Sequence, residues 1–197
     1  MNDLEKQFEH HFQVILSSKF REGSGLGNEV PFFISTFLPE QQVEADKLSD
    51  LLTKRLKKEG VLVKTINLFK LCINLLEKDN TLNEYLEYEL KSDKANFLNA
   101  LNSELNVEEK LTPEILKIME DDDESILFIT GVGAVFPVVR THTILTNLQR
   151  LGRKQPTILF FPGLYTFKDG RGSALDLFGK LNEDRYYRAF NLNDYKI

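Results

Sequence analysis

The stretch SILFITGVGAVFPVV, residues 125–139, is the longest run of the chain without a charged side chain. Its first six residues, Ser125 to Thr130, are almost continuously apolar, whereas a strand with one solvated face alternates apolar and polar residues. Continuous apolar runs are typical of parallel strands that are covered on both faces. Gly131 and Gly133 interrupt the run directly after the predicted strand. This stretch therefore predicts a buried parallel strand that ends in a turn.

Three other segments have the same character as this strand. Residues 30–38, 61–68 and 156–161 are short apolar runs, and we expect Pro162 and Gly163 to stop the last of them. The amphipathic pattern of residues 44–58 predicts a helix between the first two strands. A strand–helix–strand unit with such short connections is a crossover between parallel strands. The aromatic segment 186–190 could add an edge strand.

The remaining patterns predict helices. Leucine, isoleucine and phenylalanine recur at helical spacing in residues 4–15, 68–90, 91–106, 112–118 and 141–151, and Ala174 to Phe178 reads as one helical turn. The expected fold class is a three-layer α/β fold: a mostly parallel sheet of four to five strands, helices on both faces, and a helical insertion. We expect one domain over residues 1–197, with an N-terminal helix in 1–20 and the insertion in 69–120.

Composition excludes several classes of protein. The chain has 197 residues, a formal net charge of −5, one cysteine (Cys72) and three histidines. A mildly acidic chain is a poor overall match for nucleic acid, a single cysteine forms no internal disulfide or four-cysteine zinc site, and no signal peptide or membrane span is apparent. We therefore expect a cytoplasmic protein that contacts no membrane and holds no metal or cofactor.

The turn after residue 130 is the candidate ligand loop. Gly131 and Gly133 could let an anion approach the backbone N–H groups, with Arg140 and His142 near the start of the following helix. The third glycine of a dinucleotide fingerprint is missing, and no Walker lysine follows any glycine cluster. An ordinary strand-to-helix turn and a solvated or capping His142 are the competing interpretation, and the chain offers no catalytic residues.

A second candidate surface follows the last buried strand. Aromatic and basic side chains gather there and in the tail: Leu164, Tyr165, Phe167, Arg171, Tyr186, Tyr187 and Arg188. Exposed aromatics beside arginine are typical of protein interfaces. A packed turn over the sheet explains the same residues equally well.

Three segments together point to a family. They are Leu127-Phe-Ile-Thr-Gly-Val-Gly-Ala-Val-Phe-Pro-Val-Val-Arg-Thr-His142, Pro156-Thr-Ile-Leu-Phe-Phe-Pro-Gly-Leu-Tyr165, and Leu175 to Gly179 with Tyr186-Tyr-Arg-Ala-Phe190. In this order and spacing they resemble the BrxB family of the bacterial BREX (bacteriophage exclusion) defence systems. Residues 125–191 carry the most specific part of this resemblance.

The resemblance implies an adaptor or assembly component of an antiphage complex rather than an enzyme. Its expected partner is the PglZ-type protein of the alkaline-phosphatase superfamily, with the BREX methyltransferase or ATPase as further partners, and its expected role is in host DNA methylation and phage restriction. The resemblance is also compatible with a homodimer of this chain. The alternative is a nucleotide- or nucleic-acid-binding module with a degenerate NTPase-like fold, which would use Gly131, Gly133, Arg140 and the basic segment 150–154, so that DNA remains a second kind of partner.

Overall fold

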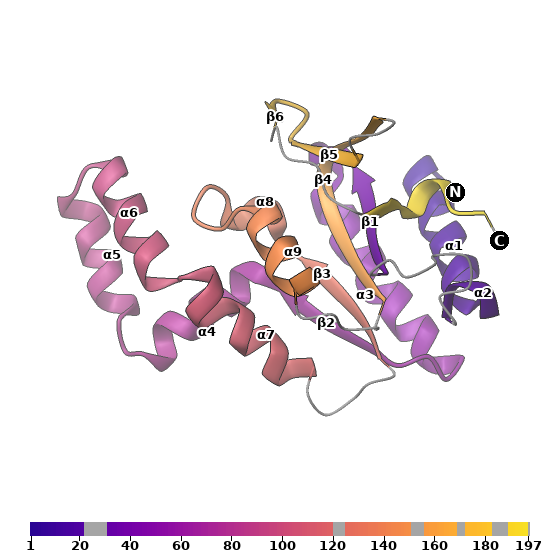
Figure 1. Ribbon diagram of the computed structural model, residues 1–197, viewed down its shortest axis with the longest axis horizontal. Coiled ribbons are helices and arrows are strands. Elements are labelled where there is room, and N and C mark those ends of the chain that lie inside the picture. Colours follow the sequence, from indigo (N-terminus) through magenta and orange to yellow (C-terminus); the bar gives the residue numbers. More distant parts are fainter. Residues whose placement is uncertain (22–30, 120–124, 151–155, 169–171, 183–188, 197) are drawn as a thin grey trace.

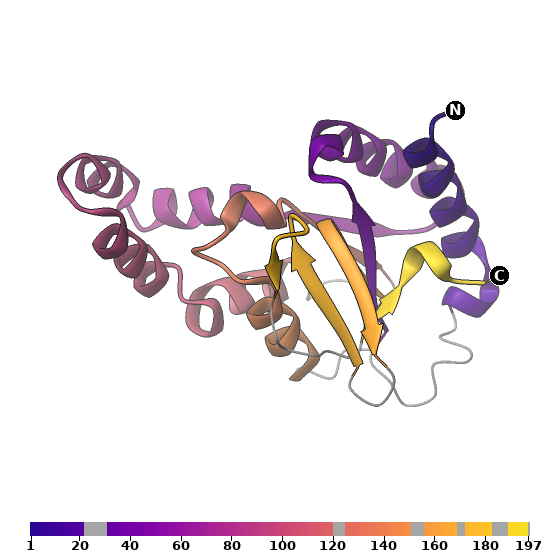
Figure 2. The same ribbon diagram turned by 90° about the horizontal axis from the view of Figure 1, so that it is seen from above.

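The computed structural model describes residues 1–21, 31–119, 125–150, 156–168, 172–182 and 189–196. It confirms a three-layer α/β fold in which a mostly parallel sheet lies between two layers of helices (Figures 1 and 2). The parallel part has five strands in the order β2-β3-β4-β1-β7. Their bounds are β1 (Phe32–Phe37), β2 (Val63–Asn67), β3 (Ile126–Thr130), β4 (Thr157–Lys168) and β7 (Phe190–Asn191).

The apolar strands supply both cores because their side chains alternate between the two faces. On one face Phe33, Phe128 and Phe160 pack against α1 (Asp3–Leu16), α2 (Ser18–Arg21) and α3 (Gln42–Lys58). On the other face Ile34, Ile129 and Phe161 pack against the helices that follow β2 and β3. Every residue of β3 is buried, as its continuous apolar pattern predicts.

The helices on the second face include the expected insertion between β2 and β3. The insertion consists of α4 (Leu68–Lys78), α5 (Leu82–Lys91), α6 (Lys94–Glu104), a π-helical turn (Val107–Leu111) and α7 (Thr112–Met119). Two further helices on this face follow β3, namely α8 (Val132–Val135) and α9 (Thr141–Arg150). The predicted helix over 68–90 is divided, because the left-handed residue Asn80 ends α4. No helix in the described parts of the chain is long and apolar enough to cross a membrane.

The helices α5 and α6 form an arm that projects away from the sheet (Figures 1 and 2). Neither helix contains a buried residue. Tyr85 donates a hydrogen bond from its hydroxyl to the carbonyl oxygen of Ala100 across the arm, at 3.3 Å, and Tyr88 lies against Phe97. Leu90 is 86% exposed. The two helices of the arm therefore contact each other, and the partly buried Leu82, Tyr85 and Leu101 attach the arm to the core.

The fourth strand does not stop at Pro162, contrary to the expectation from the Pro-Gly pair. It continues to Lys168 and changes partners, pairing with β1 in parallel as far as Pro162 and then with β5 (Gly172–Leu177) antiparallel from Gly163. The N–H of Thr157 donates toward β1, so the backbone of Pro162 faces the other side of β4, where the pairing with β3 ends at Leu159 and the carbonyl oxygen of Pro162 accepts a hydrogen bond from the N–H of Phe178. The proline therefore lies between the β3 ladder and the β5 ladder, where a residue without an N–H is tolerated.

The predicted helical turn at Ala174 to Phe178 is wrong. Residues 172–177 form β5, which pairs with both β4 and β6 (Leu181–Asn182). Ala174, Leu175 and Leu177 are buried beside β4, so a cross-strand pairing outweighs the helical propensity of an Ala-Leu-Asp-Leu segment. The predicted edge strand is confirmed only at its end, since β7 starts at Phe190 and residues 183–188 lie outside the described residues.

Candidate functional site

A crevice of about 340 Å³ opens where the parallel strands end, between the two layers of helices. Partners and ligands of parallel sheets usually bind beyond the carboxyl ends of the strands. The crevice is lined by the start of α3, the start of α4, the turn after β3, and the point where β4 changes partners. Its lining residues are Pro39, Gln42, Asp46, Asn67, Phe69, Lys70, Gly131, Gly133, Ala134, Pro162 and Phe178.

Asn67 and Gly131 join two of these segments. The Oδ1 atom of Asn67 accepts a hydrogen bond from the N–H of Lys70 at 3.0 Å and so caps α4. Gly131 has a φ of +73°, and a Cβ atom there would lie 2.7 Å from the same Oδ1. Only glycine suits this position, both for its backbone conformation and for the close approach of Asn67.

Gly133 lies against Phe178 in a similarly close contact. A Cβ atom at Gly133 would lie 3.0 Å from the Phe178 ring and 3.0 Å from Pro162. Phe178 itself has a φ of +57°, which is rare for an aromatic residue. This conformation keeps the Phe178 ring at the mouth of the crevice, and such backbone outliers cluster at functional sites.

Four exposed apolar side chains, which we call the apolar edge, either line this crevice or lie beside residues next to its lining. They are Leu38, Phe69, Leu164 and Phe178, whose exposed fractions are 55%, 47%, 50% and 36%. Leu38 precedes Pro39 of the crevice lining, and Leu164 lies beside Gly179, next to Phe178. A group of apolar residues gathered at one place is more informative than single exposed ones, because soluble proteins rarely expose contiguous apolar patches without a use.

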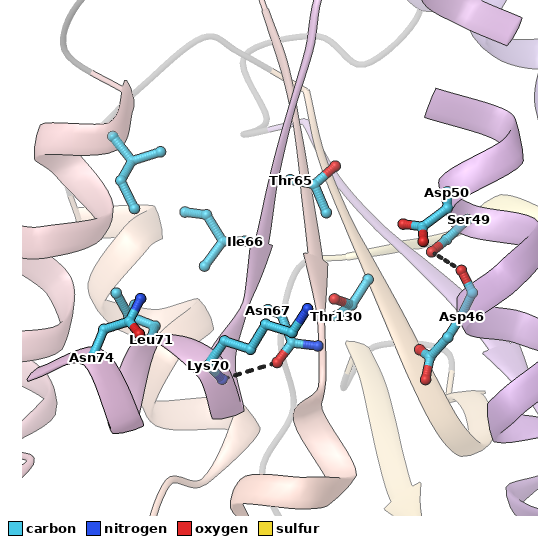
Figure 3. Close-up of a pocket in the computed structure, with 11 residues that line it drawn as sticks. Asp46, Ser49, Asp50, Thr65, Ile66, Asn67, Lys70, Leu71, Asn74 and Thr130 are labelled. Atoms are coloured by element: carbon cyan, nitrogen blue, oxygen red, sulfur yellow. Dashed lines mark hydrogen bonds between the residues drawn. The ribbon is translucent and has the colours of Figure 1, made fainter. Parts of the chain in front are cut away.

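A polar groove of about 460 Å³ continues from the crevice along β2 (Figure 3). Asp46, Ser49 and Asp50 of α3 line one wall, and Asn67 and Lys70 lie at its end. Partial burial raises the pKa of Asp46, and the neighbouring charge of Asp50 acts in the same direction; a hydrogen bond from Gln42 and the charge of Lys70 oppose them.

The structure separates the predicted ligand-loop residues. Gly131 and Gly133 line the crevice, whereas Arg140 lies in a shallow depression with Glu108 and Thr143. His142 is 7% exposed, so the expectation of a solvated histidine is wrong; it lies within 3.2 Å of the Thr143 hydroxyl. The side chain of Asn67 lies against Gly131, and α8, the helix that follows, has only four residues. These contacts favour the strand-to-helix turn over a phosphate loop.

The predicted partner residues are only partly described. Leu164 belongs to the apolar edge. Tyr165 is half-buried, and its hydroxyl donates to the carbonyl oxygen of Ala189 at 2.9 Å, which gives this side chain a structural contact. Phe167 pairs with Ser173 in the β4–β5 ladder. Arg171, Tyr186, Tyr187 and Arg188 lie outside the described residues.

Sequence reasoning missed Phe69 and Phe178. The helical pattern of residues 68–90 places Phe69 on the same apolar face as Cys72 and so predicts that both are buried. In the structure Cys72 is buried and Phe69 is exposed. The buried face of α4 is already filled by Leu68, Leu71, Cys72, Leu75 and Leu76. Phe69 therefore falls outside the apolar stripe and is left on the exposed side of the helix. No comparable signal identified Phe178, because the left-handed backbone at this position is set by the β5–β6 turn.

Comparison with known proteins gives a consistent result. The family model described as "BREX protein BrxB" matches residues 64–192. A curated BREX protein BrxB of Bacillus cereus (strain H3081.97) is 32% identical, over 98% of this chain and 100% of the relative. A curated BREX protein BrxB of Escherichia coli O9:H4 (strain HS) is 25% identical, over 90% of this chain and 86% of the relative. No solved structure matches significantly.

Proposed function

Because the chain belongs to the BrxB family of BREX antiphage defence systems, we propose that it is a non-catalytic adaptor that holds other BREX proteins in one complex. Its principal partner in this proposal is the PglZ-type protein, and the complex serves host DNA methylation and phage restriction. The methyltransferase and the ATPase of the system are the further candidates for binding.

The observation that carries the adaptor proposal is the apolar edge at the mouth of the crevice. Two of these exposed side chains are held by regular elements, Phe69 in the first turn of α4 and Leu164 in β4, and Phe178 is held in the turn between β5 and β6. Anchors of this kind, preorganised and able to become fully desolvated, supply most of the binding energy of protein interfaces. The left-handed backbone of Phe178 supports the same interpretation, because it holds an aromatic ring partly exposed to solvent.

Two substitutions test the apolar edge directly. Phe69→Ala and Leu164→Ala each remove an exposed side chain, so both variants should stay folded. We expect each to weaken binding of the purified PglZ-type protein by about 2 kcal/mol, close to a thirtyfold rise in Kd, as for an interface hot spot. Co-purification of the tagged protein with its BREX partners, followed by light scattering, gives the stoichiometry, and calorimetry gives the Kd.

Leu51 provides a matched control. It is 50% exposed, like Leu164, but lies on α3 and lines neither the crevice nor the groove. Leu51→Ala should bind as tightly as the wild type. Equal binding by all three variants would refute the site, and a tagged protein that recovers no BREX partner would refute the adaptor. In cells carrying the whole system, Phe69→Ala should reduce both methylation and restriction, and Leu51→Ala should reduce neither.

A further inference from the structure

Strand β2 ends the parallel sheet with an unpaired edge. It pairs with β3 on one side, and no strand within the described residues pairs with the other. The N–H of Ile126 donates to the carbonyl oxygen of Leu62, and Ile126 is opposite Val63. In a parallel ladder of this register, the peptide groups of Lys64 face β3, whereas the N–H and C=O groups of Val63 and Thr65 point outward.

The polar groove runs along this open edge, between the two layers of helices. Asp46, Ser49 and Asp50 of α3 form one wall. Leu71, Asn74 and Ile118 of α4 and α7 form the other, and β2 lies between the two walls (Figure 3). The groove is therefore placed where the next strand of the sheet would lie, since neighbouring strands are about 4.8 Å apart.

The two walls differ in chemistry, which specifies an occupant. Thr65 points toward the α3 wall and Ile66 toward the opposite wall (Figure 3). The side chains of an added strand would alternate in the same way. On the α3 wall they would meet Asp46 and Asp50, two exposed carboxylates, and Asp50 forms no hydrogen bond or ion pair with a described residue. On the other wall they would meet Leu71 and Ile118.

We propose that β2 accepts an extended segment of another polypeptide as an additional strand, and that the side chains of this segment alternate between basic and apolar. Backbone hydrogen bonds to Val63 and Thr65 would supply affinity, and the two walls would supply specificity, as in other cases of strand addition. The carboxylates of the α3 wall pair with the basic positions, while the apolar positions cover Leu71 and Ile118.

A synthetic peptide tests the proposal without any BREX partner. An eight-residue peptide of alternating valine and lysine, labelled with fluorescein, should bind the full chain in an anisotropy titration at low salt. The isomer with four valines followed by four lysines should bind at least tenfold more weakly. Hydrogen exchange followed by NMR should show new protection of the amides of Val63 and Thr65 in the complex, with the amide of Lys64 unchanged because it already faces β3.

Two variants locate the binding on the edge. Asp50→Lys reverses a groove charge and should weaken binding at least tenfold, whereas Glu59→Lys, an equal charge change on an exposed residue at the far end of α3, should not. Thr65→Pro removes one outward N–H without touching the β2–β3 ladder and should also weaken binding at least tenfold. Absence of binding at millimolar peptide, or binding that leaves Val63 and Thr65 unprotected, would overturn the proposal.

This inference does not depend on the apolar edge. If the peptide fails but Phe69→Ala still loses the PglZ-type protein, strand addition is refuted and the adaptor stands. If the peptide binds as described but Phe69→Ala keeps its partner, the open edge remains a binding site and the apolar edge is not one.

Discussion

His11 is a titratable side chain that is enclosed between α1 and the C-terminal segment. It is fully buried, and its Nε2 atom lies 2.9 Å from Oδ1 of Asn193. The amide nitrogen of Asn193 points toward the carbonyl and hydroxyl oxygens of Thr36, so Oδ1 accepts the bond and Nε2 of His11 donates it. The other ring nitrogen, Nδ1, is buried and forms no hydrogen bond with the described residues. His11 is therefore neutral in the folded protein.

The pH dependence of stability follows from this neutral state. Burial lowers the pKa of His11 from its usual 6.5 to about 4. Between these values the unfolded chain binds a proton that the folded chain does not, so the free energy of unfolding decreases as the pH falls. We expect the loss between pH 7 and pH 4 to be about 3 kcal/mol larger than in a His11→Gln variant. Urea unfolding of both proteins at pH 7 and pH 4 measures this difference. An equal loss of unfolding free energy in the wild type and in His11→Gln would contradict a buried, neutral His11.

Single residues also show where sequence reasoning is weakest. The burial of Cys72 was predictable from one helical stripe. The burial of His142 was not predictable, because its helix α9 packs against α7 and the 107–111 turn, which are distant in sequence. The same holds for Tyr165, whose contact with Ala189 is set by the tertiary fold. The sequence allows Tyr165 to be either an interface residue or a residue packed over the sheet, and only the tertiary packing decides between the two.

At the scale of elements, the four apolar strands β1 to β4 were predictable, but the full course of β4 was not. The apolar runs of β1, β2, β3 and the first half of β4 fall where the sequence places them. A proline normally ends a strand, and that rule failed because Pro162 lies between the end of the β3–β4 pairing and the start of the β4–β5 pairing. The change of partners at Gly163 is a property of strand pairing, on which local patterns carry little information.

Gly163 is the residue that makes this change of partners possible. A Cβ atom there would lie 2.2 Å from the carbonyl oxygen of Asp176 and 2.7 Å from the Phe161 ring, so backbone would have to move. We expect Gly163→Ala to lower the free energy of unfolding by about 3 kcal/mol, the upper range for overpacking. Gly60→Ala is the control, because Gly60 has a φ of +77° but no atom within 4 Å of its Cβ position. Gly60→Ala should lower the free energy of unfolding by about 1 kcal/mol. Equal losses of stability for the two variants in thermal melts would contradict the steric explanation.

For the whole molecule, the sheet connects two cores that lie on opposite faces. Phe128 and Ile129 are neighbours on β3 and belong to different cores, so neither core can be lost without exposing the strand they share. This arrangement supports the proposal that residues 1–197 are one domain. The three-layer class was predictable because continuous apolar strands require cover on both faces. The strand order was not, since it depends on crossovers that no local pattern encodes.

The two cores should unfold together because they share the sheet, whereas the arm formed by α5 and α6 should unfold independently. Because α5 and α6 bury no side chain completely, they can open without unfolding the sheet. We expect their amides to exchange with a free energy of opening several kcal/mol below that of β3, whose amides should require global unfolding. Hydrogen exchange measured by mass spectrometry gives both values in one experiment. Equal protection of the arm and β3 would mean that the arm is an integral part of the domain.

The open edge of β2 has a consequence for the cell as well as for the complex. A row of unpaired backbone donors and acceptors is also a template for a second copy of the same strand, which is how edge strands seed aggregation. Lys64, whose ammonium group reaches the carbonyl oxygen of Ile118 beside this edge, is the type of residue that discourages such pairing. In the strand-addition proposal, a copy of the protein without its partner segment keeps this edge open, and Lys64 is then the residue that opposes pairing with a second copy.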